Sequence, residues 1–227
     1  MVTIVLWDLD GTIQDSETLG LAGTRHGFEQ VLGRIPTEEE YAQLMGRPVP
    51  VVYREWFEEE LVQQILAAGN EYYLEREDEI ICYSGVPEML AVLKQRGYRM
   101  GIVTSKPLVY ALGELKAKGL DGLFEVMVAQ EDTDRHKPHP DPLLEAVRRL
   151  NAAPEECVYI GDQPSDIRAA HAAQMRSIAA LWGEGTLERV APTDPTRVAY
   201  EPMDIVKLMD ELSNCLETSD TLVVKKL

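Results

Sequence analysis

The 227-residue sequence contains few cysteines, and an odd number of them, so they cannot all pair within the chain. The three, Cys82, Cys157 and Cys215, also lack the close spacing of a metal-binding cysteine cluster. A disulfide framework and a cysteine-based metal site are therefore not expected. We expect reduced thiols, as in a cytoplasmic protein.

Long apolar segments are also missing from the sequence. No run of 18 or more apolar residues occurs, so we expect no transmembrane helix. The first residues lack the basic start and the cleavage pattern of a secretory signal. Both observations favour a protein of the cytoplasm.

Basic residues are scarce relative to acidic ones. The chain has 22 Lys and Arg against 39 Asp and Glu, which gives a formal net charge of −17. Nucleic acids and anionic membrane surfaces require a basic face, so neither is expected as a partner. The imbalance is concentrated in residues 15–83, which contain 15 acids, 5 bases and no lysine. We interpret the acidic clusters there as solvated helix faces.

Residues 15–83 carry helix signals throughout. Ser16 can cap a first helix, and Thr37 with Glu40 forms a capping box at the start of a second. Residues 55–79 predict one or two further amphipathic helices. The segment therefore reads as an all-helical block.

From residue 84 onward, strand and helix signals alternate. Helices are predicted at 87–96, 107–118, 141–150, 165–173 and 204–216, and strands at 98–103, 124–129, 157–160 and 177–181. This alternation predicts a parallel sheet with helices on both faces. We therefore expect an α/β protein. Its Rossmann-like core comprises residues 1–14 and 84–227, an all-helical cap domain is inserted at 15–83, and residues 218–227 form a tail.

Two carboxylates follow the first predicted strand. The apolar run at 4–7 is followed directly by Asp8 and Asp10, one residue apart. Like charges held close together disfavour each other's ionisation, so a cation should neutralise them, and a divalent metal is the usual solution. Ligands of open α/β sheets bind beyond the carboxyl ends of the strands. The pair therefore predicts a catalytic metal site.

The other predicted strand ends supply further reactive side chains. Thr104 and Ser105 follow the second strand of the core, Lys137 lies in the loop after the third, and Asp162 and Asp166 follow the fourth. Taken singly, most of these residues would be ordinary helix caps or surface residues. In one parallel sheet these ends share an edge, so the set predicts a single crevice that holds carboxylates, a hydroxyl and an ammonium group.

The ordered set of motifs resembles that of the haloacid dehalogenase superfamily phosphatases with a helical (type 1) cap. The resemblance rests on Asp-Leu-Asp-Gly-Thr at 8–12, Thr104, Lys137 and Gly161-Asp162, and it covers nearly all of residues 1–212. It implies a hydrolase that requires Mg²⁺ and acts on a small phosphorylated metabolite.

The resemblance also implies roles for the acidic residues. Asp8 would attack phosphorus to form an aspartyl-phosphate, and Asp10 would protonate the leaving oxygen and then activate water. Mg²⁺ would be held by Asp8, the main-chain carbonyl of Asp10, and Asp162. Asp166 would be a further ligand or a partner through water.

The remaining implied roles concern substrate binding. Thr104 would hydrogen-bond a transferring oxygen, Lys137 would offset the charge on the phosphoryl group and on Asp8, and Ser105 would contact substrate. Arg47 lies in a Gly-containing cap turn of the kind that dips toward substrate in the family. It could pair bidentately with a substrate carboxylate or second phosphate, or it could be an exposed turn residue.

Several features select among family members. Asp10 favours phosphate esters or anhydrides over haloacids, because a halide leaves without a proton. The absence of lysine before Lys94 removes the cap Schiff base of carbon–phosphorus hydrolases. Only His26 is available in the cap for the proton steering of a mutase, so a mutase is not favoured.

The residues at 98–182 resemble phosphoglycolate phosphatases and their pyrophosphatase relatives, with Gln163 in place of the usual Ser or Thr. We expect Gln163 to alter a hydrogen bond near the metal and not the chemistry. An inorganic pyrophosphatase, a nucleotidase and a catalytically inactive binding module remain as alternatives, and the protein could be a monomer or a homodimer.

Overall fold

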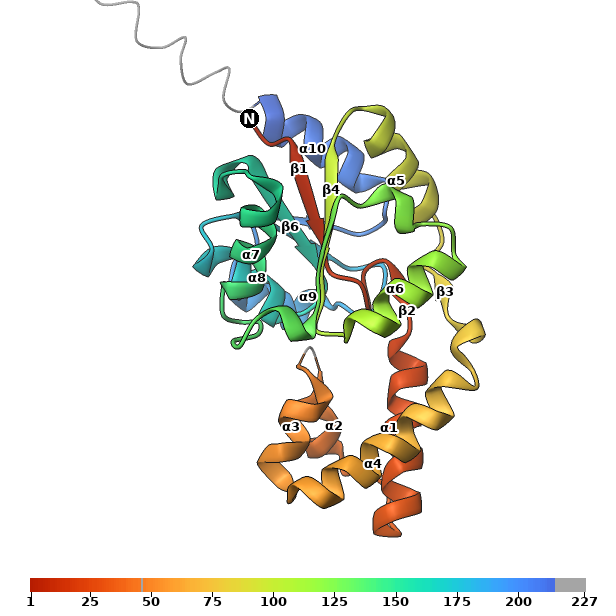
Figure 1. Cartoon of the computed structure of the whole chain (residues 1–227). Helices are drawn as coiled ribbons and strands as arrows, with labels where there is room; N and C mark the ends of the chain where they lie inside the picture. Colours follow the sequence, from red (N-terminus) through yellow and green to blue (C-terminus); the bar gives the residue numbers. More distant parts are fainter. Residues whose placement is uncertain (46, 215–227) are drawn as a thin grey trace, which may run out of the picture.

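The computed structural model describes residues 1–45 and 47–214, and a single parallel sheet dominates it (Figure 1). The strand order is β5-β4-β1-β6-β7-β8, with every neighbouring pair parallel. The strands are β1 Ile4–Trp7, β4 Arg99–Val103, β5 Val126–Val128, β6 Cys157–Gly161, β7 Arg176–Ala180 and β8 Arg197–Ala199. The predicted α/β fold with a Rossmann-like parallel sheet is confirmed, and β8 is a strand that the sequence analysis missed.

Helices cover both faces of this sheet. They are α5 Val86–Gln95, α6 Leu108–Ala117, α7 Asp141–Leu150, α8 Pro164–Ala172, α9 Leu187–Val190 and α10 Asp204–Asn214. Short 3₁₀ turns lie at Glu77–Glu79, Asp121–Leu123, Gln130–Asp132, Pro154–Glu156 and Ala191–Thr193. The helices follow the strands along the chain, so each brings the next strand back in the same direction.

The central strand β1 is buried on both faces because its side chains alternate between two cores. Val5 and Trp7 pack in the core that also contains residues of α5 and α10. Ile4 and Leu6 pack on the opposite face with residues of α7 and α8. The two-residue period of a strand places these pairs on opposite sides, so β1 is anchored from both.

Four α-helices are inserted between Asp15 and Ile81 and lie below the sheet in Figure 1. They are α1 Glu17–Leu32, α2 Glu38–Leu44, α3 Val49–Trp56 and α4 Glu59–Leu74. The predicted capping box of Thr37 and Glu40 is present at the start of α2. Helix α3 was not predicted. We refer to α1–α4 as the insert.

The two long helices of the insert, α1 and α4, approach each other closely through glycines. A Cβ added at Gly27 would lie 2.5 Å from the carbonyl oxygen of Ile65, and one added at Gly23 would lie 2.9 Å from that of Gly69. Larger side chains at these positions would push the two helices apart. The glycines therefore fix the spacing of the pair.

Both connections between the insert and the sheet run through a small antiparallel ribbon. Strand β2, Gln14–Asp15, pairs with β3, Ile81–Cys82. The expectation that residues 15–83 are helical throughout is wrong at these positions. Two-residue strands are too short to show a periodic pattern, so pairing across the ribbon had no signal in the sequence.

Two further findings concern membrane-spanning helices and the cysteines. No helix within residues 1–45 and 47–214 combines the length and the hydropathy of a membrane span. Cys82 and Cys157 are free thiols. Cys215, the last residues of the helix predicted at 204–216 and the predicted tail at 218–227 lie outside the described residues.

Candidate active site

The carboxyl ends of the central strands meet at one edge of the sheet, next to the insert (Figure 1). Asp8 follows β1, Thr104 follows β4 and Asp162 follows β6, and these three strands are neighbours. The backbone N–H of Asp8 donates to the carbonyl of Ile160 at 2.8 Å, which ties the end of β1 to β6. Sheet topology alone thus gathers the predicted residues.

Lys137 lies at the centre of the first charged cluster. Its Nζ is 3.0 Å from Asp8 Oδ1 and 2.7 Å from Asp166 Oδ1, and it donates to the Tyr159 hydroxyl at 3.0 Å. All four side chains are buried. Burial would lower the pKa of Lys137, but Asp166 and Asp8 outweigh burial and raise it well above its ordinary value. Lys137 is therefore a permanent cation held against Asp8.

Three carboxylates crowd the same position. Oxygens of Asp8, Asp162 and Asp166 all lie within 4.8 Å of one another, and the three residues are buried. Burial raises the pKa of Asp8 to about 7, although Lys137 opposes the shift. Burial, together with Asp166 and Asp8, also raises the pKa of Asp162 well above its ordinary value. Lys137 alone does not neutralise three acids, so the cluster has room for further positive charge.

The donor set fits a hard divalent cation such as Mg²⁺, which prefers carboxylate oxygens and water. The two oxygens of Asp166 are already engaged, since Oδ1 contacts Lys137 and Oδ2 accepts the backbone N–H of Gln163 at 2.9 Å. Asp166 therefore also orients Lys137, and the three carboxylates together are the candidate ligands.

Asp162 is held by its neighbours. Its Oδ1 accepts the Thr12 hydroxyl at 3.2 Å, and the side-chain amide of Gln163 donates to its Oδ2. Gln163 in turn accepts a hydrogen bond from Arg189. Gln163, which stands where Ser or Thr is usual, therefore lies beside Asp162, the candidate metal ligand, as expected. Gly11 has a φ of +78°, and a Cβ there would lie 2.7 Å from Asp162 Oδ2. Only glycine fits this close approach.

Asp10 belongs to a second charged cluster that the sequence analysis missed. Lys106 Nζ lies 2.8 Å from Asp10 Oδ1, and Ser16 and Gln14 also donate to that oxygen. Burial would raise the pKa of Asp10, but Lys106, Ser16 and Gln14 together lower it below its ordinary value. The Ser16 hydroxyl thus donates to Asp10, and it makes no capping hydrogen bond to α1.

Lys106 connects Asp10 to two further residues. Its Nζ is 2.7 Å from Glu114 Oε2 in α6 and 2.9 Å from the hydroxyl of Tyr73 in α4, and Tyr73 donates to Glu114 Oε1 at 2.6 Å. Glu114 is 2% exposed although α6 is otherwise apolar at its inner positions. A glutamate at an inner position of a predicted apolar helix, eight residues after a lysine that follows Thr104 by two residues, is the signal that could have identified this cluster.

A cavity of about 290 Å³ lies between this edge of the sheet and the insert. Asp8, Asp10, Thr104, Ser105 and Lys137 all line it. Thr104 Oγ1 also accepts the backbone N–H of Lys106 at 3.1 Å. The structure therefore brings these predicted residues to one cavity.

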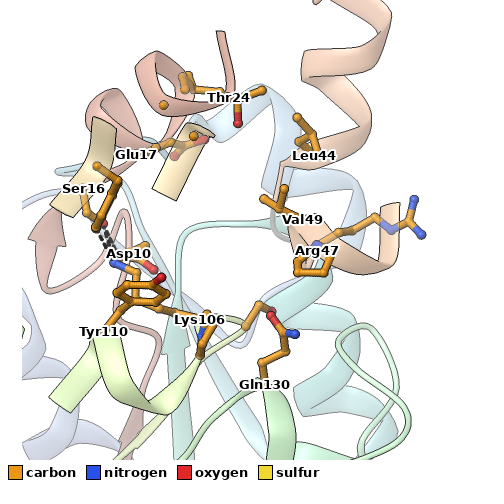
Figure 2. Close-up of a pocket in the computed structure, with 18 of the residues that line it drawn as sticks. Asp10, Ser16, Glu17, Thr24, Leu44, Arg47, Val49, Lys106, Tyr110 and Gln130 are labelled. Carbon is orange, nitrogen blue, oxygen red and sulfur yellow. Dashed lines mark hydrogen bonds and ion pairs between the residues drawn. The ribbon is translucent and has the colours of Figure 1, made fainter. Parts of the chain in front are cut away.

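Arg47 lines the same cavity, but its charge is directed elsewhere. The guanidinium forms a bidentate pair with Glu55, at 2.5 Å for the shorter contact, and both side chains are partly exposed. Figure 2 shows the guanidinium pointing away from Asp10 and Lys106. The substrate-binding role of Arg47 stays a prediction that this conformation does not display.

Comparison with known proteins agrees with the geometry. A family model described as haloacid dehalogenase-like hydrolase matches residues 5–180. The pyrophosphatase PpaX of Bacillus mycoides is 30% identical, over 93% of this chain and 95% of its own length. A protein of Caldanaerobacter subterraneus, provisionally named as the same pyrophosphatase, is 34% identical over 92% of this chain and 94% of its own.

A solved structure supports the fold independently. A protein of Haemophilus somnus, described as a predicted phosphoglycolate phosphatase, superposes with a TM-score of 0.83. It is 24% identical, over 92% of this chain and 98% of its own. From the family match, the relatives and the fold together, the chain belongs to the haloacid dehalogenase-like hydrolases.

Proposed function

We propose that the protein is a Mg²⁺-dependent phosphatase that hydrolyses a small phosphorylated metabolite through an aspartyl-phosphate. The proposal rests on one observation: a buried carboxylate, Asp8, is held 3.0 Å from the buried ammonium of Lys137, beside two further carboxylates. This arrangement supports the roles of Asp8 as nucleophile, of Lys137 as a fixed cation and of the neighbouring carboxylates as metal ligands. Phosphoryl transfer depends mainly on such positioning and charge.

The proposed first step transfers the phosphoryl group to Asp8. A bond forms between an oxygen of Asp8 and phosphorus as the bond from phosphorus to the ester oxygen breaks, and Asp10 gives its proton to that oxygen. Lys137 and Thr104 hold the transferring oxygens, and Ser105 contacts the substrate. When bound, Mg²⁺ would be held by Asp8, Asp162 and the main-chain carbonyl of Asp10, with Asp166 behind them, and would offset the charge of the phosphoryl group.

The proposed second step restores Asp8. Water attacks phosphorus while Asp10 takes up one of the water protons, and the bond between phosphorus and the Asp8 oxygen breaks to release phosphate. The net reaction is ester plus water to alcohol plus phosphate. Lys106 favours the ionised form of Asp10 that this step needs. The first step needs the protonated form, so poor leaving groups should depend more on Asp10 than good ones do.

Hydrolysis of p-nitrophenyl phosphate by the pure protein tests the proposal. We expect turnover with Mg²⁺, loss of turnover after chelation, and none with Asp8→Asn. Incubation with ³²P-labelled substrate and rapid acid quenching should leave label on the wild-type protein and none on Asp8→Asn. A folded protein that binds phosphate esters without any turnover would instead be an inactive binding module.

The relatives named as pyrophosphatases favour a second candidate, inorganic pyrophosphatase. Release of phosphate from pyrophosphate, assayed beside phosphoglycolate, separates the two activities. We propose action in the cytoplasm, as a monomer or homodimer, on small molecules and not on nucleic acid. Sedimentation of the full chain determines the oligomeric state.

A further inference from the structure

The cavity above Asp8 has two chemically different walls. The core wall carries the carboxylates and lysines described above. The insert wall is lined largely by apolar side chains from all four of its helices, among them Leu21, Leu44, Val49, Ile65 and Leu66. Figure 2 shows Leu44 and Val49 on the insert side, across the cavity from Asp10 and Lys106. The leaving group of a bound ester must extend toward this wall, because Asp8 and Lys137 hold the phosphoryl end.

Every cation among the described residues that line the cavity is already paired. Lys137 contacts Asp8 and Asp166, Lys106 contacts Asp10 and Glu114, and Arg47 contacts Glu55. The other insert arginines do not line the cavity, and the insert has no lysine. A second anionic group on a substrate would therefore lack a ready partner at the insert wall.

One acidic side chain further disfavours a second anionic group on the substrate. Glu17, in the first turn of α1, also lines the cavity. Burial raises the pKa of Glu17 to about 7, and nearby Glu184 contributes to the shift. An additional carboxylate or phosphate placed here would meet partial negative charge as well as apolar surface. Burying an unpaired anion in such a setting is costly.

We propose that the preferred substrates are phosphate monoesters whose leaving group is uncharged and apolar, such as those of aliphatic or aromatic alcohols, over pyrophosphate and phosphoglycolate. This deepens the proposed phosphatase function and rests on it. The insert wall selects through removal of apolar surface from water. Each methylene group buried there should raise kcat/KM about fourfold.

A series of esters with similar leaving-group chemistry tests the proposal. Ethyl, butyl and hexyl phosphate are compared with phosphoglycolate and pyrophosphate, all with Mg²⁺. We expect kcat/KM to rise about 15-fold from ethyl to butyl phosphate, and both anionic compounds to fall below ethyl phosphate. A flat alkyl series, or a preference for either anionic compound, would overturn the proposal. Turnover of none of these compounds, nor of p-nitrophenyl phosphate, would overturn the proposed function and this inference with it.

Placing a cation on the insert wall should reverse the preference. Leu66 and Leu74 lie on the same helix, but only Leu66 lines the cavity, and Leu74 is 48% exposed. Leu66→Lys should raise kcat/KM for phosphoglycolate relative to hexyl phosphate by tenfold or more, while Leu74→Lys leaves the ratio unchanged. Equal ratios in the two variants would contradict the assignment of this wall.

A second variant covers the case in which Leu66→Lys does not fold. Val49 is partly exposed at the start of α3, and Val49→Thr keeps its shape while adding a hydroxyl. We expect this variant to reduce kcat/KM for hexyl phosphate severalfold and to leave ethyl phosphate nearly unchanged. An equal loss for both esters would count against an apolar leaving-group site.

Discussion

The two charged clusters of the active site contain the same kinds of side chain, but these side chains come from different parts of the molecule. In each, a lysine is shared by two carboxylates and a tyrosine hydroxyl; Lys137 is buried and Lys106 is partly buried. The cluster of Lys137 is built from the core alone: Lys137 lies in the loop after β5, Asp8 follows β1, Tyr159 is in β6 and Asp166 is in α8. The cluster of Lys106 includes Tyr73 from the insert. The core thus fixes the nucleophile by itself, whereas the proposed acid–base residue is held by core and insert together.

The clusters also shift their aspartates in opposite directions. Burial raises the pKa of Asp8 to about 7, although Lys137 opposes the shift, and the negative charge of Asp166 adds to it. Lys106, Ser16 and Gln14 lower the pKa of Asp10 despite its burial. The first cluster has one lysine for three carboxylates, Asp8, Asp162 and Asp166, whereas the second has one for two, so the first has the larger excess of negative charge for a metal to offset.

The largest effect should come from the nucleophile. Asp8→Asn keeps the shape of the side chain but removes the attacking oxygen anion, so we expect kcat to fall by about four orders of magnitude or more. Steady-state hydrolysis of p-nitrophenyl phosphate measures it, with Asp134→Asn, a carboxylate outside the cavity lining, as the matched control. Substantial turnover by Asp8→Asn would remove Asp8 from its assigned role.

Lys106 should matter chiefly in the second step. In the double variant Lys106→Met, Glu114→Gln, the second change avoids leaving Glu114 as an unpaired buried charge, and loss of the Lys106 cation raises the pKa of Asp10. We expect slower aspartyl-phosphate hydrolysis by about 10²-fold, with an unchanged initial burst of p-nitrophenol. Rapid-quench kinetics separate the two phases, and Lys116→Met, at an exposed position of α6, is the control. Loss of the burst itself would show that Lys106 acts on the first step.

Stability of the metal-free protein should report the raised pKa of Asp8. A carboxyl whose pKa is higher in the folded state binds its proton more tightly there, so stability falls as pH rises from about 4 to 7. Asp8→Asn should remove that part of the fall, worth roughly 5–10 °C in Tm between pH 5 and pH 8. Thermal unfolding in EDTA measures it, and identical pH profiles for the two proteins would contradict the shift.

Asp10 should behave in the opposite way in the same experiment. Its pKa is lowered on folding, so its contribution is present above its ordinary pKa and is lost as pH falls through the folded value. Asp10→Asn should therefore destabilise the protein at pH 7 and lose this effect near pH 3. A gain in stability at pH 7 would contradict the balance of the Lys106 cluster.

The smallest effect should come from the contact across the two regions. Tyr73→Phe removes one partly buried hydroxyl that bonds Lys106 and Glu114, and we expect a loss of about 1 kcal/mol, or roughly 2–4 °C in Tm. Tyr72→Phe, on the same helix, is the control, because Tyr72 stacks on His26 and contacts Arg76 through its ring. Equal effects of the two changes would indicate that the Tyr73 hydroxyl does not tie the insert to the core.

The sequence was sufficient for residues that follow apolar strands. Asp8, Thr104 and Asp162 each end such a run, and the parallel topology that brings the runs together follows from the alternation of strands and helices. The position of Lys137 in the site was predicted from the family motif that contains it. These residues could be predicted because their position along the chain determines their position on the sheet edge.

For the Lys106 cluster the sequence offered only the glutamate at an inner position of α6 and did not identify the partners of Lys106. Lys106 contacts Asp10, 96 residues away, and Tyr73, 33 residues away, and the contacts depend on how α4 and α6 pack. The conformation of Arg47 was likewise set by a neighbour in space, Glu55, that the turn motif does not specify. Side-chain partners from different elements are decided by packing, which a local pattern does not encode.

The β2–β3 ribbon has a consequence for how such a protein can change. Because the chain leaves and re-enters the core on paired strands, the two crossing points are only about 4.8 Å apart. Any segment whose two ends lie at that spacing can replace the insert, which lines one side of the active-site cavity, without moving β1 or β4. Substrate preference can therefore diversify through replacement of the inserted segment, while the residues that carry the chemistry stay unchanged.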